Sequence, residues 1–116
     1  MSEQSFQSFK DFYPYYLSEH RNGACRSCHF FGSSLVLSLL VYSLLTAHWG
    51  LVALLPLAGY GPAWVGHFFF EKNRPATFSY PRWSFIADWV MMKDIVLGRV
   101  PLRGELPREC YESPLS

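Results

Sequence analysis

The feature that most constrains this chain is an uncharged run. Residues 27–70, between Arg26 and Glu71, are 44 consecutive positions without Asp, Glu, Lys or Arg. A soluble domain of 116 residues has little interior in which to bury such a run. As one α-helix the run would extend about 66 Å, roughly twice the ~30 Å hydrocarbon core of a bilayer. Its length therefore predicts two membrane crossings.

Turn-forming residues divide this run into two segments. The first break is expected around residues 46–50. Residues that end or kink helices lie further along, at Pro56, Gly59, Gly61 and Pro62. We predict an antiparallel hairpin of transmembrane helices over about residues 30–45 and 49–70. The first helix carries four serines among Leu and Val, which makes it a candidate homodimer surface. The alternative is a buried helical hairpin in a soluble domain.

The charges flank the hairpin and predict its orientation. The basic residues nearest to it are Arg21, Arg26, Lys72, Arg74 and Arg82. The turn near His48 carries no charge, and basic residues favour the cytoplasmic side. We therefore expect an integral membrane protein with both hairpin ends in the cytoplasm, in the inner membrane if the protein is bacterial. The net charge of only +1 argues against a nucleic-acid partner.

A third, amphipathic helix is predicted from Ser84, a favourable N-cap residue, to Leu97, before Gly98. The helical period places Asp88 inside its apolar face, with Asp94 off that face. Residues 71–80 are expected to form a loop and residues 100–116 a turn-rich, poorly ordered tail. The chain is thus predicted to be one all-α domain, residues 1–116, with its helical membrane core in residues 9–99.

The hairpin sorts the four histidines. It returns His29, just before the first crossing, and His67, near the end of the second, to one side of the membrane. His20 lies nine residues before His29, half a turn out of phase on a single helix, so the two can meet only if Asn22-Gly23 breaks the helix. His48 lies at the opposite turn, roughly 28 Å from His67 by helical rise, and is excluded.

Three converging imidazoles suggest a metal site. Neutral imidazole nitrogens bind Fe(II), Zn(II) or Mn(II), and a nitrogen-rich site with open positions suits oxygen-activating iron. Asp88 is a candidate additional ligand. Glu71 follows His67 by one helical turn, and we expect it either to ligate the metal or to orient that ring. Interfacial histidines bonded to carbonyls and lipid phosphates are equally compatible with the spacing.

The cysteines offer a competing interpretation. Residues 25–29, CRSCH, match the C-x-x-C-H pattern of covalent haem attachment. That attachment occurs outside the cytoplasm, whereas the charge bias places this segment inside. A thioredoxin-like role for Cys25 and Cys28 lacks the strand-helix context that it requires. Cys110 has no obvious partner, so reduced cysteines without a special role are the simplest interpretation.

Two blocks of sequence are specific enough to indicate a family: residues 59–68, GYGPAWVGHF, and residues 71–77, EKNRPAT. Weaker matches accompany them, at Phe12-Tyr13, Tyr16-Leu17, Glu19-His20, His29, Gly32, Pro81, Ser84 and Asp88. Together they resemble the 2-hydroxy fatty acid (2-hydroxypalmitate) dioxygenases, small membrane proteins formerly catalogued as a domain of unknown function, and in particular their bacterial members. The resemblance spans about residues 9–99.

The resemblance implies an Fe(II)-dependent α-oxidation. A 2-hydroxy long-chain fatty acid and O₂ would give the acid one carbon shorter, CO₂ and water, with the substrate supplying all four electrons. Neither nicotinamide nor flavin is then needed, and no Gly-rich dinucleotide motif is present. The substrate's carboxylate and 2-hydroxyl would chelate the iron, with the acyl tail between helices or in lipid.

The resemblance also assigns residues. It implies that His20, His29 and His67 bind the iron and are catalytic. Asp88 joins the catalytic set, either completing the iron sphere or holding a histidine. The candidate substrate-binding residues are Glu71, Asn73 and Arg74, whose guanidinium suits a carboxylate. The alternatives are a non-enzymatic membrane interaction module with incidental histidines and, less favoured, the haem-binding electron carrier.

Overall fold

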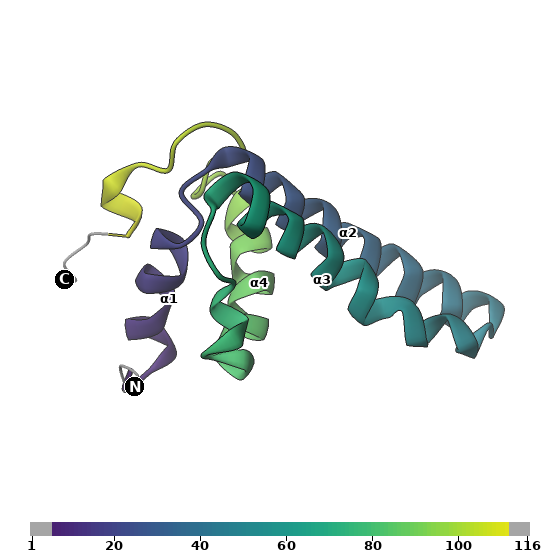
Figure 1. Ribbon diagram of the computed structural model, residues 1–116. Coiled ribbons are helices and arrows are strands. Elements are labelled where there is room, and N and C mark those ends of the chain that lie inside the picture. The colour runs from purple at the N-terminus through teal and green to yellow at the C-terminus, as the bar shows by residue number, and fades with distance from the viewer. Residues whose placement is uncertain (1–5, 112–116) are drawn as a thin grey trace.

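The computed structural model describes residues 6–111, so residues 1–5 and 112–116 of the predicted domain lie outside the described part (Figure 1). Its elements in chain order are α1 (Phe9–Ser18), α2 (Gly23–Thr46), η1 (Trp49–Leu54), α3 (Leu55–Val65), η2 (Gly66–Glu71), η3 (Ala76–Phe78), α4 (Pro81–Val96) and η4 (Arg108–Cys110). Each of these is helical, η2 being a π-helix and the other short elements 3₁₀ helices. Within the described residues, the predicted all-α class is confirmed.

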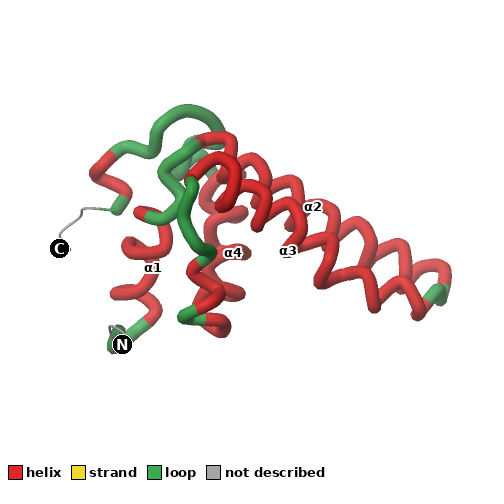
Figure 2. The backbone as a smooth tube through the Cα atoms, viewed as in Figure 1, coloured by secondary structure: helices red, strands yellow, loops and turns green. Residues whose placement is uncertain are grey.

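A long arm dominates the shape of the molecule. α2 and the continuous segment η1–α3–η2 run side by side in opposite directions (Figure 1). A tight turn joins them, with Ala47 in the left-handed region at φ 58°. Figure 2 shows that, apart from this turn, the loops gather at the other end of the molecule, near both termini. We call residues 34–62 the outer arm and the remaining described residues, 6–33 and 63–111, the head.

The two antiparallel segments of the arm, α2 and η1–α3–η2, which we call its strokes, are each long and apolar enough to span a membrane. They are 24 residues (Gly23–Thr46) and 23 residues (Trp49–Glu71) long, with mean hydropathies of 1.7 and 1.2. Only 22% and 17% of their most apolar windows are buried inside the protein. The helix pair of a soluble core would be largely covered, so this low burial disfavours a buried soluble hairpin.

Glycines set the closest approach of the two strokes. A Cβ on Gly32 would lie 2.9 Å from the carbonyl oxygen of Gly59, and a Cβ on Gly66 would lie 3.0 Å from the Cα of Cys25. Helix α3 continues through Gly59, Gly61 and Pro62 rather than ending there. Close backbone packing therefore explains Gly32 and Gly66, whereas Gly59, Gly61 and Pro62 do not end the helix.

α1 and α4 pack together in the head around an aromatic core. Its buried members are Phe12, Tyr16, Leu17, Ala76, Ala87, Met91, Val100 and Leu106. Val100 and Leu106 belong to the predicted turn-rich tail, which is expected to be poorly ordered after Pro101. They are 3% and 1% exposed, and the Leu106 N–H donates to the Arg21 carbonyl at 3.1 Å. As far as residue 111, that prediction is wrong, because this segment covers the core.

α4 differs from its prediction in start and face. It begins at Pro81, which is favoured in a first helical turn, and Ser84 lies on the buried face instead of capping the helix. Asp94, expected off the buried face, is 8% exposed and accepts a hydrogen bond from the Tyr13 hydroxyl at 2.8 Å. Phe85, expected on the buried stripe, is 55% exposed. The helix ends as predicted, before Gly98 at φ 82°.

Candidate metal centre

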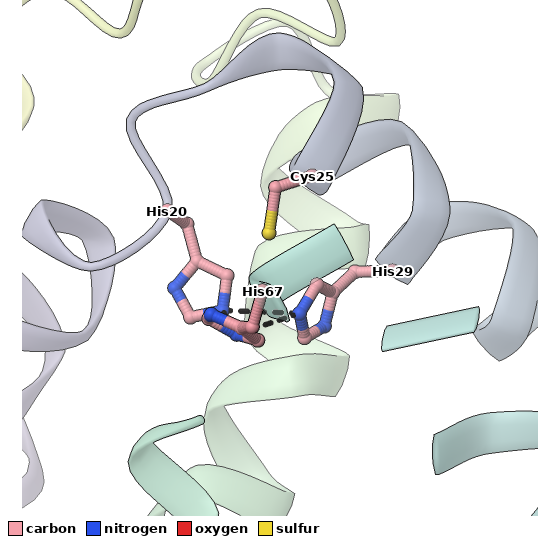
Figure 3. A group of neighbouring side chains, drawn as sticks. All are labelled: His20, Cys25, His29 and His67. Carbon is pink, nitrogen blue, oxygen red and sulfur yellow. Dashed lines mark hydrogen bonds between the residues drawn. The ribbon is translucent and has the colours of Figure 1, made fainter. Parts of the chain in front are cut away.

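Three histidines from different elements meet where the arm joins the head (Figure 3). His20 follows the end of α1, His29 lies in α2, and His67 lies in the π-helical turn η2. Asn22 caps α2, with its side-chain oxygen accepting from the Ala24 N–H at 2.8 Å. The helix break predicted at Asn22-Gly23 is therefore present, and it lets His20 turn toward His29.

The imidazoles face one another through their Nε2 atoms. These atoms are 3.1 Å apart between His20 and His29, 3.1 Å between His29 and His67, and 2.9 Å between His67 and His20. All three side chains are buried, at 0%, 7% and 1% exposure. His48 lies at the far turn, bonded to Thr46, so the histidines meet and separate as the spacing predicts.

The outer ring nitrogens determine the tautomers. The Nδ1 of His20 lies 2.6 Å from the Tyr16 carbonyl oxygen, and the Nδ1 of His67 lies 2.7 Å from Asn73 Oδ1. The Asn73 amide is oriented this way because its nitrogen donates to two oxygens of Glu19, at 3.1 and 3.2 Å. Since both partners of Nδ1 are acceptors, Nδ1 carries the hydrogen and Nε2 presents a lone pair.

His29 follows the same pattern through Asp88. Its Nδ1 lies 3.5 Å from a carboxylate oxygen of Asp88, which also accepts a hydrogen bond from the Tyr16 hydroxyl. Asp88 therefore lies behind His29, on the side away from the facing Nε2 atoms. This position matches the expected role of holding a histidine. Burial and the Asp88 carboxylate raise the pKa of Tyr16 well above its usual value, so its hydroxyl stays a donor.

This donor set fits a divalent metal ion. Three lone pairs converging at about 3 Å repel one another unless a cation lies among them. Metal–nitrogen bonds of about 2.1 Å are compatible with nitrogen atoms at this separation. The three rings line a small cavity of about 10 Å³, roughly the room that one water-sized species requires.

Burial also prepares His20 for this role. It lowers the pKa of His20 well below its usual value, and the neighbouring imidazoles lower it further. A neutral ring is the form that binds a metal. His20 is therefore ready to act as a ligand at neutral pH.

The chain also matches a known protein family. The family described as 2-hydroxy-palmitic acid dioxygenase Mpo1-like matches residues 6–100. The chain belongs to this family. The match includes all three histidines and confirms the resemblance seen in the sequence. No curated protein and no solved structure gives a significant match.

The other residues proposed for this Mpo1-like site are more scattered. Asn73, and not Glu71, contacts the ring of His67. The Glu71 carboxylate instead accepts a hydrogen bond from the backbone N–H of Asn22, at the start of α2. Arg74 is exposed, with its guanidinium 5.7 Å from the centre of the Phe78 ring. A substrate contact by any of the three stays a prediction.

Cys25 lies beside the histidine cluster, although the sequence did not predict it as part of the site. Its sulfur and one ring nitrogen of each histidine lie within 4.8 Å of one another, and Figure 3 shows the sulfur pointing toward the rings. The signal was the four-residue spacing from His29, which places both on one helix face. A C-x-x-C-H haem would need His29 as its axial ligand, whereas the Nε2 atom of His29 faces His20 and His67.

Proposed function

We propose that this chain is an Fe(II)-dependent dioxygenase that shortens 2-hydroxy long-chain fatty acids by one carbon. The observation that carries the proposal is the set of three Nε2 lone pairs converging in a small buried cavity. The family description, 2-hydroxy-palmitic acid dioxygenase, supports the substrate class and the use of O₂. Three nitrogen ligands would leave positions for other ligands, as oxygen-activating iron requires.

We also propose that the arm is a transmembrane hairpin. The length, hydropathy and low burial of its two strokes support this arrangement. Basic residues flank the base of the arm, where it joins the head, among them Arg21, Lys72 and Arg74. This distribution favours the cytoplasmic side for the head. The metal site then lies at the level of the membrane surface, where a fatty acid headgroup resides.

In the proposed mechanism the residues of the chain hold the site rigid and dry. His20, His29 and His67 would bind iron through Nε2. Hydrogen bonds at Nδ1 orient the rings of His20 and His67, and the Asp88 carboxylate, 3.5 Å from Nδ1, orients that of His29. The Asp88 carboxylate behind His29 makes that imidazole a stronger donor. Bound iron would supply the one-electron chemistry that O₂ requires. The reaction R–CHOH–COOH + O₂ → R–COOH + CO₂ + H₂O balances without an external reductant.

The experiment is a comparison of two histidine variants. Detergent-purified protein is loaded with Fe(II) without oxygen, and iron per chain is measured for wild type, His67→Ala and His48→Ala. We expect about one iron in the wild type. We expect the same in His48→Ala, whose side chain is exposed at the far turn, and none in His67→Ala. Far-UV circular dichroism checks that each variant is folded.

Oxygen uptake then tests the reaction. The proposal expects uptake only when Fe(II) and a 2-hydroxy fatty acid are both present, with release of the shorter acid. Equal, negligible iron in all three proteins would remove the metal site and leave a membrane interaction module. Iron binding without uptake, over several acyl lengths, would retain the site and exclude this reaction.

A further inference from the structure

A second, much larger cavity adjoins the histidine cluster. It lies between α4 and the two strokes of the arm and has a volume of about 490 Å³, within the range of small-molecule sites. His29, Tyr60 and Asp88 line both this cavity and the small one among the histidines. The large cavity is therefore a groove that leads away from the proposed iron site.

The groove is polar at one end and apolar along the rest. Its polar side chains include His29, Asp88 and Ser33, which follows His29 by one helical turn and is 9% exposed. Beyond them the walls are apolar, with Val36 and Leu40 from α2, Leu55 and Pro56 from α3, and Phe85 and Trp89 from α4. A ligand that matches this lining has one polar end and a hydrocarbon tail.

The length of the groove agrees with such a tail. From His29 to Leu40 is 11 residues of α2, a rise of about 16 Å. A zigzag of single bonds of about 1.5 Å advances about 1.3 Å per carbon, so this length accommodates roughly a dozen carbons. Because the strokes are antiparallel, Leu40 lies opposite the start of α3, where Leu55 closes the far end.

We propose that this groove binds the acyl chain of the substrate, with the carboxyl end at His29 and the methyl end between Leu40 and Leu55. The identity of the headgroup rests on the proposed function, whereas the acyl site rests on the lining. Phe85 is 55% exposed, so the groove is open along α4. The fatty acid therefore reaches it from the apolar surroundings of the arm.

Photo-crosslinking of metal-free protein tests this site without turnover. The probe is a palmitic acid analogue with a diazirine at its methyl end, and adducts are mapped by mass spectrometry. We expect adducts around residues 36–40 and 55–59, suppressed by unlabelled palmitic acid but not by added phospholipid. Suppression by phospholipid would assign the groove to a bilayer lipid. Adducts spread over exposed residues outside these two windows, such as Leu45 and Phe69, would contradict the assignment of the groove.

Matched tryptophan variants then test where the far end of the groove lies. Leu40→Trp fills the far end and should reduce the palmitic acid adduct about tenfold, as overpacking of this kind does, while a lauric acid analogue still reacts. Leu45→Trp is the control, because Leu45 is 81% exposed on the same helix. Leu55→Trp, from the opposite wall, should repeat the effect if Leu40→Trp fails to fold. Unchanged adducts in every folded variant would overturn the assignment.

These results are independent of the test of the reaction. Iron-dependent oxygen uptake with no groove adduct would leave the enzyme without this acyl site. Groove adducts in a protein that binds no iron would establish a fatty acid site and exclude the dioxygenase.

Discussion

The outer arm exposes its apolar side chains, whereas the head buries charged side chains beside its apolar core. Among residues 34–62 of the outer arm, Ser43 alone is buried, while Leu45 and Leu57 are 81% and 69% exposed. In the head, the buried side chains include Arg26 at 0% and Asp94 at 8% exposure. An apolar exterior requires apolar surroundings, whereas a polar interior requires hydrogen-bond partners. The outer arm therefore depends on what surrounds it, and the head on its own internal contacts.

Arg26 illustrates how the head accommodates a buried charge. Its guanidinium donates to the carbonyl oxygens of His20 at 2.9 Å, Arg21 at 2.8 Å and Pro101 at 2.7 Å, and also to that of Gly104. The first two carbonyls precede α2, and the last two follow α4. One side chain therefore joins three segments, and it fixes the backbone of a proposed iron ligand, His20.

Among the variants that test the difference between the outer arm and the head, Arg26→Met is expected to have the largest effect. The change removes the guanidinium donor from the carbonyl oxygens of His20, which is buried, and of Pro101 and Gly104, which are partly buried. We expect a loss of about 3 kcal/mol or more in the free energy of unfolding. Denaturant unfolding in detergent, followed by circular dichroism, measures it. The control is Arg82→Met, at an exposed position of α4. Equal stability of the two variants would show that the head does not depend on this contact.

A matched pair of leucines compares the two regions directly. Leu106→Ala removes a side chain that is 1% exposed in the head, and Leu57→Ala one that is 69% exposed in the outer arm. We expect a loss of about 2–4 kcal/mol for the first and less than about 0.5 kcal/mol for the second in detergent. Equal losses would contradict the division into two regions. The same unfolding assay applies.

At the candidate metal site, Asn73→Leu tests how far metal affinity depends on a hydrogen bond inside the head. It removes the acceptor that holds the His67 ring, and the loss of such a partner costs about 10- to 100-fold in metal affinity. Competition with a chelator measures the affinity. The control is Arg74→Ala, whose exposed side chain should not affect metal binding. An unchanged affinity in Asn73→Leu would mean that packing alone orients the ring.

The smallest expected effect is a pH dependence of the metal-free head. The pKa of His20 is lowered in the folded protein, so below its usual value of about 6.5 the unfolded chain binds a proton that the folded chain does not. Stability should therefore fall with decreasing pH, by up to about 1.4 kcal/mol per pH unit for this group. Glu19, whose pKa is raised by burial, acts in the opposite direction near its own lower range.

Unfolding is followed between about pH 7.5 and pH 5.5, the range around the usual pKa of a histidine in the unfolded chain. His48→Ala should retain the slope, because His48 is exposed, whereas His20→Gln should reduce it. A flat profile in the wild type would mean that His20 titrates alike in the folded and unfolded states.

The sequence predicted the meeting of the histidines because that meeting depends on spacing alone. An uncharged run of fixed length, a break at residues 46–50 and the helical rise bring His29 and His67 together and keep His48 apart. The turn chemistry of Asn22-Gly23 was enough to bring in His20. The position of Asp88 followed from the helical period, and the structure places it against His29.

Contacts between distant segments could not be predicted in this way. Asp94 is buried because Tyr13, 81 positions away, donates to it. Asn73 contacts His67 only because the left-handed backbone at Lys72, φ 62°, reverses the chain after η2. Neither contact leaves a period or a motif in the sequence.

The sequence by itself determined the helical class, the family and which three histidines meet, because periodicity, run length and motif blocks are properties of local sequence. The tertiary structure alone decided which atoms of those rings face inward, which partners hold them and where a groove opens beside His29. These features depend on how α1, α4 and the C-terminal segment pack against the base of the arm. The histidines that meet can thus be predicted from the sequence, whereas their orientation is a property of the fold.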